Sequence, residues 1–122
     1  KQIDMKNSIQ IELTSYLLDL ANEGVLTNNN REDWHFEAFN EDYYIIGYYQ
    51  ASEWLKKHSI DSFEAVGICQ QYEIDNFGEA SSVYDNSEKV VNMLVYIYGE
   101  ELLNDLNVET VEELKSELLE LV

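Results

Sequence analysis

Apolar residues recur three and four positions apart along most of the chain, and this spacing is typical of amphipathic helices. Five segments follow it, covering residues 9–20, 43–58, 63–77, 90–103 and 111–121. Proline, which interrupts helices, is absent from the sequence. The pattern therefore predicts a mainly α protein, built as a compact bundle of about five helices.

Residues that favour helix ends flank these segments. Two glycines, Gly24 and Gly78, are placed to end helices with a left-handed residue. Two segments begin with the capping-box pattern, in which an acidic residue follows the N-cap residue after three positions. These pairs are Asp61 with Glu64 and Thr110 with Glu113, and the other N-cap candidates are Asn40 and either Asn86 or Ser87.

The stretch 34–39, Trp-His-Phe-Glu-Ala-Phe, alternates loosely between apolar and polar residues. It is the best candidate for a short strand, and it fits equally well an extended loop that inserts aromatic side chains into the core. Gly99 lies inside one of the helical segments and predicts a kink there. No repeat or linker divides the sequence, so we expect a single domain over residues 1–122.

The chain of 122 residues has 25 acidic and only 7 basic side chains, which gives a formal net charge of −18. Apolar residues make up 45% of the sequence, enough for a core that holds the fold together against this charge. No apolar run approaches the roughly 18 residues of a membrane helix, so we expect a cytoplasmic protein without a membrane contact. Cys69 is the single cysteine, which excludes a disulfide framework within the chain.

No recognisable catalytic or cofactor motif is present. His35 and His58 lack the spacing of a metal-ligand pair, the glycines are too scattered for a phosphate loop, and Cys69 lies on an apolar stripe. We therefore expect no metal, no cofactor and no enzymatic activity. A small enzyme with a pocket around His35, His58 or Cys69 is the least favoured alternative.

Acidic residues are concentrated in the last 24 positions, where Lys115 is the only basic residue. Along a helix, carboxylates four residues apart advance about 6 Å, which roughly matches every second phosphate of a DNA strand. Direct binding to nucleic acid or to an anionic membrane is disfavoured, because both are themselves negatively charged. The candidate partner-binding carboxylates are Glu100, Glu101, Asp105, Glu109, Glu112, Glu113, Glu117 and Glu120.

Four tyrosines, Tyr43, Tyr44, Tyr48 and Tyr49, lie within seven residues. They are too many to share one buried face, so some of them are expected at the surface. Exposed tyrosine is favoured in protein interfaces, because its ring is apolar and its hydroxyl can bind water or a partner. A core that uses tyrosine in place of leucine explains the cluster equally well.

The segment 62–103 is similar to small acidic phage proteins of unassigned function. The likeness is carried by Tyr72-Glu73, by Asn76-Phe77-Gly78-Glu79 and by Tyr98-Gly99-Glu100-Glu101. Together with the small size, acidity and aromatic content, it resembles the phage-encoded DNA-mimic proteins that block restriction or CRISPR enzymes. The resemblance covers about a third of the chain and implies an inhibitor that acts in the bacterial host.

The leading hypothesis is a non-enzymatic inhibitor that mimics DNA charge. Its partner would be a basic bacterial protein, such as a nuclease or a restriction or CRISPR component, with possible homodimerisation of the inhibitor itself. The second hypothesis is an acidic adaptor or regulator that binds its partner through the tyrosine-rich face. A merely solvated acidic surface is the third reading of the charge, since net charge by itself speaks to solubility and association.

Overall fold

The computed structural model describes the backbone of residues 5–40 and 48–122, and the side chains of residues 8–40 and 50–122. These residues form six α-helices and one short 3-10 helix and contain no strand, which confirms the mainly helical class with one helix more than expected. The elements are α1 (Met5–Glu23), η1 (Asn28–Asp33), α2 (Trp34–Phe39), α3 (Tyr48–Lys57), α4 (Ser62–Phe77), α5 (Ser87–Leu106) and α6 (Val111–Leu121).

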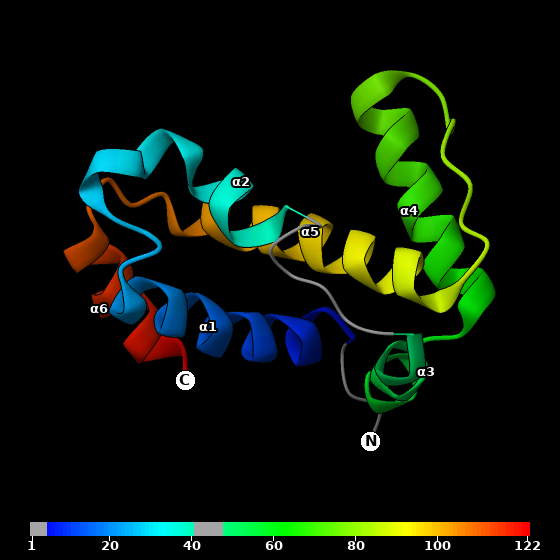
Figure 1. The fold of residues 1–122 in the computed structure, drawn as a ribbon, viewed down its shortest axis with the longest axis horizontal. Coiled ribbons are helices and arrows are strands. Elements are labelled where there is room, and N and C mark those ends of the chain that lie inside the picture. The colour runs from blue at the N-terminus through cyan, green and yellow to red at the C-terminus, as the bar shows by residue number, and fades with distance from the viewer. Residues whose placement is uncertain (1–4, 41–47) are drawn as a thin grey trace.

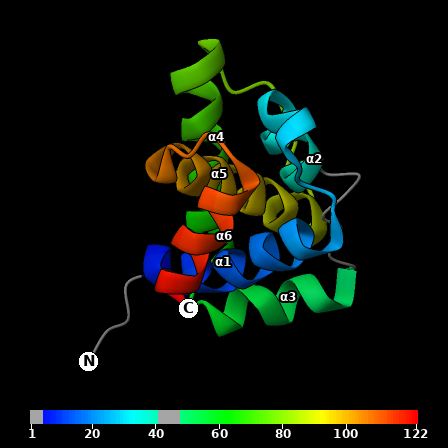
Figure 2. The same cartoon turned by 90° about the vertical axis from the view of Figure 1, so that its left-hand side faces the viewer.

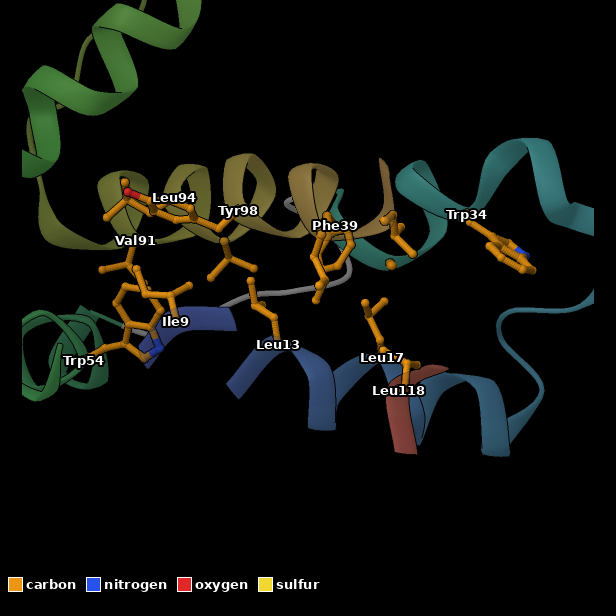
Figure 3. Close-up of a cluster of buried hydrophobic side chains, with 14 of the residues drawn as sticks. Ile9, Leu13, Leu17, Trp34, Phe39, Trp54, Val91, Leu94, Tyr98 and Leu118 are labelled. Carbon is orange, nitrogen blue, oxygen red and sulfur yellow. The ribbon is translucent and has the colours of Figure 1, made fainter. Parts of the chain in front are cut away.

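Helix α5 is the centre of the fold, and α1, α2, α3 and α4 each pack against it (Figure 1). Its residues Val91, Leu94 and Val95 are fully buried. Ile9 and Leu13 of α1 face it from the other side of the core, as Figure 3 shows. Helix α6 packs mainly on α1.

The prediction of an extended element at residues 34–39 is wrong, because this stretch forms the helix α2. Trp34, Ala38 and Phe39 are buried, a spacing of four and five positions that brings one helical face onto α5. Six residues are too few for a helical period to be distinguished from loose alternation in the sequence. Asn40 ends α2 in an extended conformation, and the helix start predicted after it lies outside the described residues.

Helix α5 continues through Gly99 without a break. The presence of a glycine at this position is accounted for by a close packing contact instead of the predicted kink. Gly99 is buried, and a Cβ atom at this position would overlap the ring of Phe39. The missing side chain therefore allows α2 to approach α5 closely.

The predicted helix ends are confirmed where the structure describes them. Asp61 accepts a hydrogen bond from the backbone N–H of Phe63 at 3.0 Å, and Thr110 accepts one from that of Glu113 at 3.2 Å. Of the two candidates before α5, Asn86 is the N-cap. Gly24 and Gly78 adopt φ angles of +84° and +88°, as expected for left-handed helix ends.

No helix within residues 5–40 and 48–122 is both long and apolar enough to cross a bilayer.

In α6, Leu114 and Leu118 are fully buried, as their spacing predicts. Leu121 was expected on the same stripe but is 51% exposed, because it lies on the last turn, beyond the part of α6 that packs on α1.

Candidate functional site

Helix α6 presents its glutamates to solvent. Leu114 and Leu118 attach one face of the helix to the core, and the glutamates lie on the rest of its surface. All four of them are exposed: Glu112, Glu113, Glu117 and Glu120.

Further carboxylates from other elements lie at the same end of the molecule. The side chain of Asn28 in η1 binds α6, accepting from the N–H of Val111 at 2.7 Å and donating to Glu112 at 3.2 Å. Arg31 donates to the carbonyl of Val108 at 2.7 Å. These bonds place η1 and the end of α1 beside α6 (Figures 1 and 2). We call this end of the molecule the acidic end; the exposed acids of the segments that meet there are Asp19, Glu23, Glu32, Asp33, Asp105, Glu109, Glu112, Glu113, Glu117 and Glu120.

The charge of the acidic end is not neutralised by the side chains around it. Among the described residues, ion pairs join Glu12 to Lys57 and His58, Glu53 to Lys56, and Asp85 to Lys89, and none involves the acidic end. Arg31 lies over the ring of Trp34, 4.7 Å from its centroid, and its Nε binds a carbonyl. A row of unpaired, solvated carboxylates therefore remains available to a cationic partner.

Two of the predicted carboxylates, Glu100 and Glu101, are half-buried on α5. Glu100 accepts a hydrogen bond from the hydroxyl of Tyr72 on α4 at 2.9 Å. Glu100 is therefore half-buried and hydrogen-bonded within the fold, unlike the exposed glutamates of α6.

The four clustered tyrosines of the sequence cannot be assigned to a surface. Tyr43 and Tyr44 lie outside the described residues, and Tyr48 and Tyr49 begin α3 with side chains outside them. Three other tyrosines are brought together instead, from α4, from the loop that follows it and from α5. Nothing in the local pattern pointed to this group, because its members are 12 or more positions apart.

These tyrosines line a groove of about 610 Å³. Its floor is α5, and its walls are the end of α2 on one side and α4 with the loop 78–86 on the other. Tyr72 packs edge-to-face on Phe77 and on Tyr96, with ring centroids 6.4 Å and 6.2 Å apart. We call it the tyrosine groove, defined by Tyr72, Phe77, Tyr84, Met93 and Tyr96.

The phenols of the tyrosine groove are held in their neutral form. Burial, and after it Glu100, raises the pKa of Tyr72 well above its usual value and also raises the pKa of Tyr96. Burial, with smaller contributions from neighbours that include Glu73, raises the pKa of Tyr84 to about 12. All three hydroxyls therefore stay protonated, and able to donate a hydrogen bond, to a higher pH than a free tyrosine does.

The residues suspected of chemistry in the sequence occupy three separate places. Cys69 is fully buried, and burial raises the pKa of its thiol to about 12, so it packs as a small apolar residue. His35 lines a small polar cavity of about 80 Å³ with Arg31 and Asn104, and burial lowers its pKa. Within the described residues, no group of three potential ligands could hold a metal ion.

His58, the residue after α3, links α3 to α1 through a group of polar contacts that we call the clasp; its members are His58, Ser8, Glu12 and Lys57. Its Nε2 lies 2.6 Å from a carboxylate oxygen of Glu12, and its Nδ1 lies 2.7 Å from the hydroxyl of Ser8. Lys57 pairs with the same oxygen of Glu12 at 3.5 Å, and the ring of Trp54 covers the imidazole at 4.3 Å between centroids. A surface hollow lies beside the clasp, but His58 is only 3% exposed, so we interpret the arrangement as a link between helices.

The clasp gives a stability prediction. Replacing Glu12 by glutamine should lower the free energy of unfolding by about 1–3 kcal/mol, because it weakens a charge-assisted hydrogen bond to a buried ring. Glu53→Gln is the matched control, since its pair with Lys56 is exposed and should contribute less than about 1 kcal/mol. Urea unfolding of both variants measures the difference, and equal effects would contradict the clasp.

Comparisons of the chain with protein-family models, with curated proteins and with solved structures give no significant match.

Proposed function

We propose that the protein is a phage or mobile-element inhibitor that mimics DNA charge. Its acidic end would occupy the basic nucleic-acid site of a bacterial defence or nucleic-acid-processing protein. The observation that supports this proposal is the acidic end itself, in which ten exposed carboxylates from α1, η1, α5, α6 and the turn between α5 and α6 have no ion-pair partner among the described residues.

The spacing of the carboxylates suits a groove that binds polyphosphate. Glu113, Glu117 and Glu120 follow one another at four and three residues along one face of α6. They therefore advance by about 4.5–6 Å, between one and two phosphate steps of about 3.4 Å. A cationic groove gains from meeting the whole row, because a single exposed ion pair contributes less than about 1 kcal/mol.

The proposal predicts binding that is steered by charge and weakened by salt. Long-range attraction raises the association rate at low ionic strength, and the Debye length falls to about 8 Å at 0.15 M salt. A pull-down from bacterial lysate at low and high salt should therefore recover a DNA- or RNA-binding protein mainly at low salt. Competition by added DNA should release that protein from the inhibitor.

A pair of charge-matched variants tests where the partner binds. The first carries Lys at Glu112, Glu113, Glu117 and Glu120. Its binding to the recovered partner should fall by a factor of about 100 or more, given about 3 kcal/mol or more from four lost pairs and the repulsion that replaces them. Circular dichroism verifies that α6 still folds.

The control variant carries Lys at four exposed acids outside the acidic end: Glu53, Glu64, Asp75 and Glu79. Both variants have a net charge of −10, since each reversal adds two to −18. Equal losses in the two variants would show that only overall charge matters, and unchanged binding in the first would refute the mimic.

The tyrosine groove supports a second candidate function, an adaptor that binds its partner through aromatic side chains. Phe77 and Val83 at its rim are 72% and 70% exposed, which leaves apolar surface for a partner. Binding through this groove would be insensitive to salt. It would be weakened more by Tyr96→Ala than by the reversals on α6.

A further inference from the structure

Helix α4 carries an uncharged stripe that the described chain leaves largely exposed. The helix rises from the rest of the molecule and packs against α5 along one face only (Figures 1 and 2). Phe63 is 88% exposed, Phe77 is 72% exposed and Ile74 is 45% exposed. With Gly67 and Gln70 they follow one another at alternating intervals of four and three residues, the repeat of a seam between two helices.

Gly67 is the least expected residue of this stripe. A glycine inside a helix is less favourable than alanine by about 1 kcal/mol. Apart from the backbone of α4 itself, no atom of the described residues lies within 4 Å of the position that a Cβ would take at Gly67. It differs in this respect from Gly99, whose absent side chain makes room for Phe39. A gap at Gly67 is useful only to a neighbour from outside the chain, because a second helix can approach most closely where the side chain is missing.

The stripe is complementary to itself when it is turned end to end. Measured along the helix axis from Gln70, Phe63 and Phe77 lie about 10.5 Å away in opposite directions. Gly67 and Ile74 lie about 4.5 Å and 6 Å away, again in opposite directions. In an antiparallel pair, Phe63 of one copy therefore meets Phe77 of the other, and Ile74 packs over Gly67, as a two-fold interface requires.

We propose that α4 is a self-association surface, on which two copies of this chain pair antiparallel through Phe63, Gly67, Gln70, Ile74 and Phe77. The two-fold match of the stripe selects a second copy over other partners, because its two ends carry the same ring and its gap at Gly67 faces Ile74 when the helix is turned end to end. Helix α4 lies at the opposite end of the long axis from α6 (Figure 1), so pairing through α4 keeps the two acidic ends far apart.

The area of the stripe predicts a weak dimer. A phenylalanine side chain can bury about 150–250 Å², so the exposed parts of Phe63 and Phe77 supply about 300 Å² per copy. With Ile74 and Gln70 the two copies together bury close to 1,000 Å², the lower limit of a specific interface. We therefore expect a monomer–dimer equilibrium in the micromolar range.

Sedimentation equilibrium over a concentration series tests the proposal. The wild-type chain should dimerise more strongly as salt rises, because salt screens the repulsion between two chains of net charge −18. This dependence is opposite in sign to that of the proposed inhibitor–target complex. A chain that stays monomeric at millimolar concentration in 0.5 M salt overturns the proposal.

Two variants and a control locate the interface. Gly67→Gln blocks the close approach while improving helix propensity, and Phe63→Gln removes an exposed ring, so neither should unfold the chain. Each should weaken dimerisation by about tenfold or more. Leu119→Gln, which removes an exposed apolar side chain from α6, should leave the dimer intact. Loss of the dimer in the control but not in the α4 variants would place the interface elsewhere and refute the proposal.

Discussion

Replacing Gly99 by alanine should lower the free energy of unfolding by about 1–3 kcal/mol, although alanine is the better helix former. The added Cβ would overlap the ring of Phe39, which is 1% exposed and packed between α2 and the core. A buried aromatic ring cannot swing into solvent, so either α2 or α5 must shift. Urea unfolding of the variant measures the loss.

Gly67→Ala is the matched control for this prediction. It makes the same chemical change in the middle of a helix, at a position where no atom lies near the new Cβ. It should therefore raise the free energy of unfolding by up to about 1 kcal/mol when measured at a concentration that keeps the chain monomeric. If Gly99→Ala is as stabilising as Gly67→Ala, the close contact between α2 and α5 is refuted.

A double-mutant cycle identifies the contact directly. Phe39→Leu alone should destabilise the protein, because it shortens a buried side chain. Combined with Gly99→Ala it should be less harmful than the two effects added together, since the smaller side chain leaves room for the methyl group. Strict additivity would show that the two positions do not touch.

The helix ends were predictable from the sequence because they depend on local chemistry. Asp61, Asn86 and Thr110 each accept a backbone N–H two or three residues ahead, so the cap and its partner lie in the same short segment. Gly24 and Gly78 need only their own φ angles to end a helix. Such features do not depend on how the helices are packed.

The candidate surfaces were predictable only in part, because they depend on packing between distant segments. The glutamates of α6 could be placed on an exposed face from their spacing relative to Leu114 and Leu118. That η1 and the end of α1 add carboxylates to the same surface depends on the bonds of Asn28 and Arg31, which reach 77 or more positions along the chain. The tyrosine groove depends in the same way on how α2 and α4 are placed on α5.

The second large loss of stability is expected on replacing Trp34, whose side chain joins η1 to the core. Its ring is 1% exposed, and its indole N–H donates to the carbonyl of Thr27 at 2.9 Å and to the side chain of Asn30 at 3.0 Å. Trp34→Phe removes this donor, and the acceptor oxygens of Thr27 and Asn30, in a partly buried turn, lose a hydrogen bond. We expect a loss of about 2–4 kcal/mol, from the missing hydrogen bonds and the smaller ring.

Trp54→Phe is the control, because Trp54 is the second of the two tryptophans of the chain and its indole N–H makes no such hydrogen bonds to the described residues. Trp54 is 7% exposed, and its indole nitrogen is buried without a hydrogen-bond partner among the described residues. Removing an unsatisfied donor offsets part of the lost packing, so Trp54→Phe should lower stability by less than about 1.5 kcal/mol. Each variant keeps one tryptophan, whose fluorescence follows urea unfolding.

Trp34→Phe should also weaken binding to a cationic partner, which distinguishes it further from Trp54→Phe. The turn held by Trp34 carries Asn28 and Arg31. Asn28 binds the first residue of α6, and Arg31 binds the carbonyl of Val108, just before α6. A looser turn spreads Glu32 and Asp33 away from the glutamates of α6, which lowers the local density of negative charge. If the two tryptophan variants lose stability and partner binding to the same extent, the hydrogen bonds of Trp34 do not organise the acidic end.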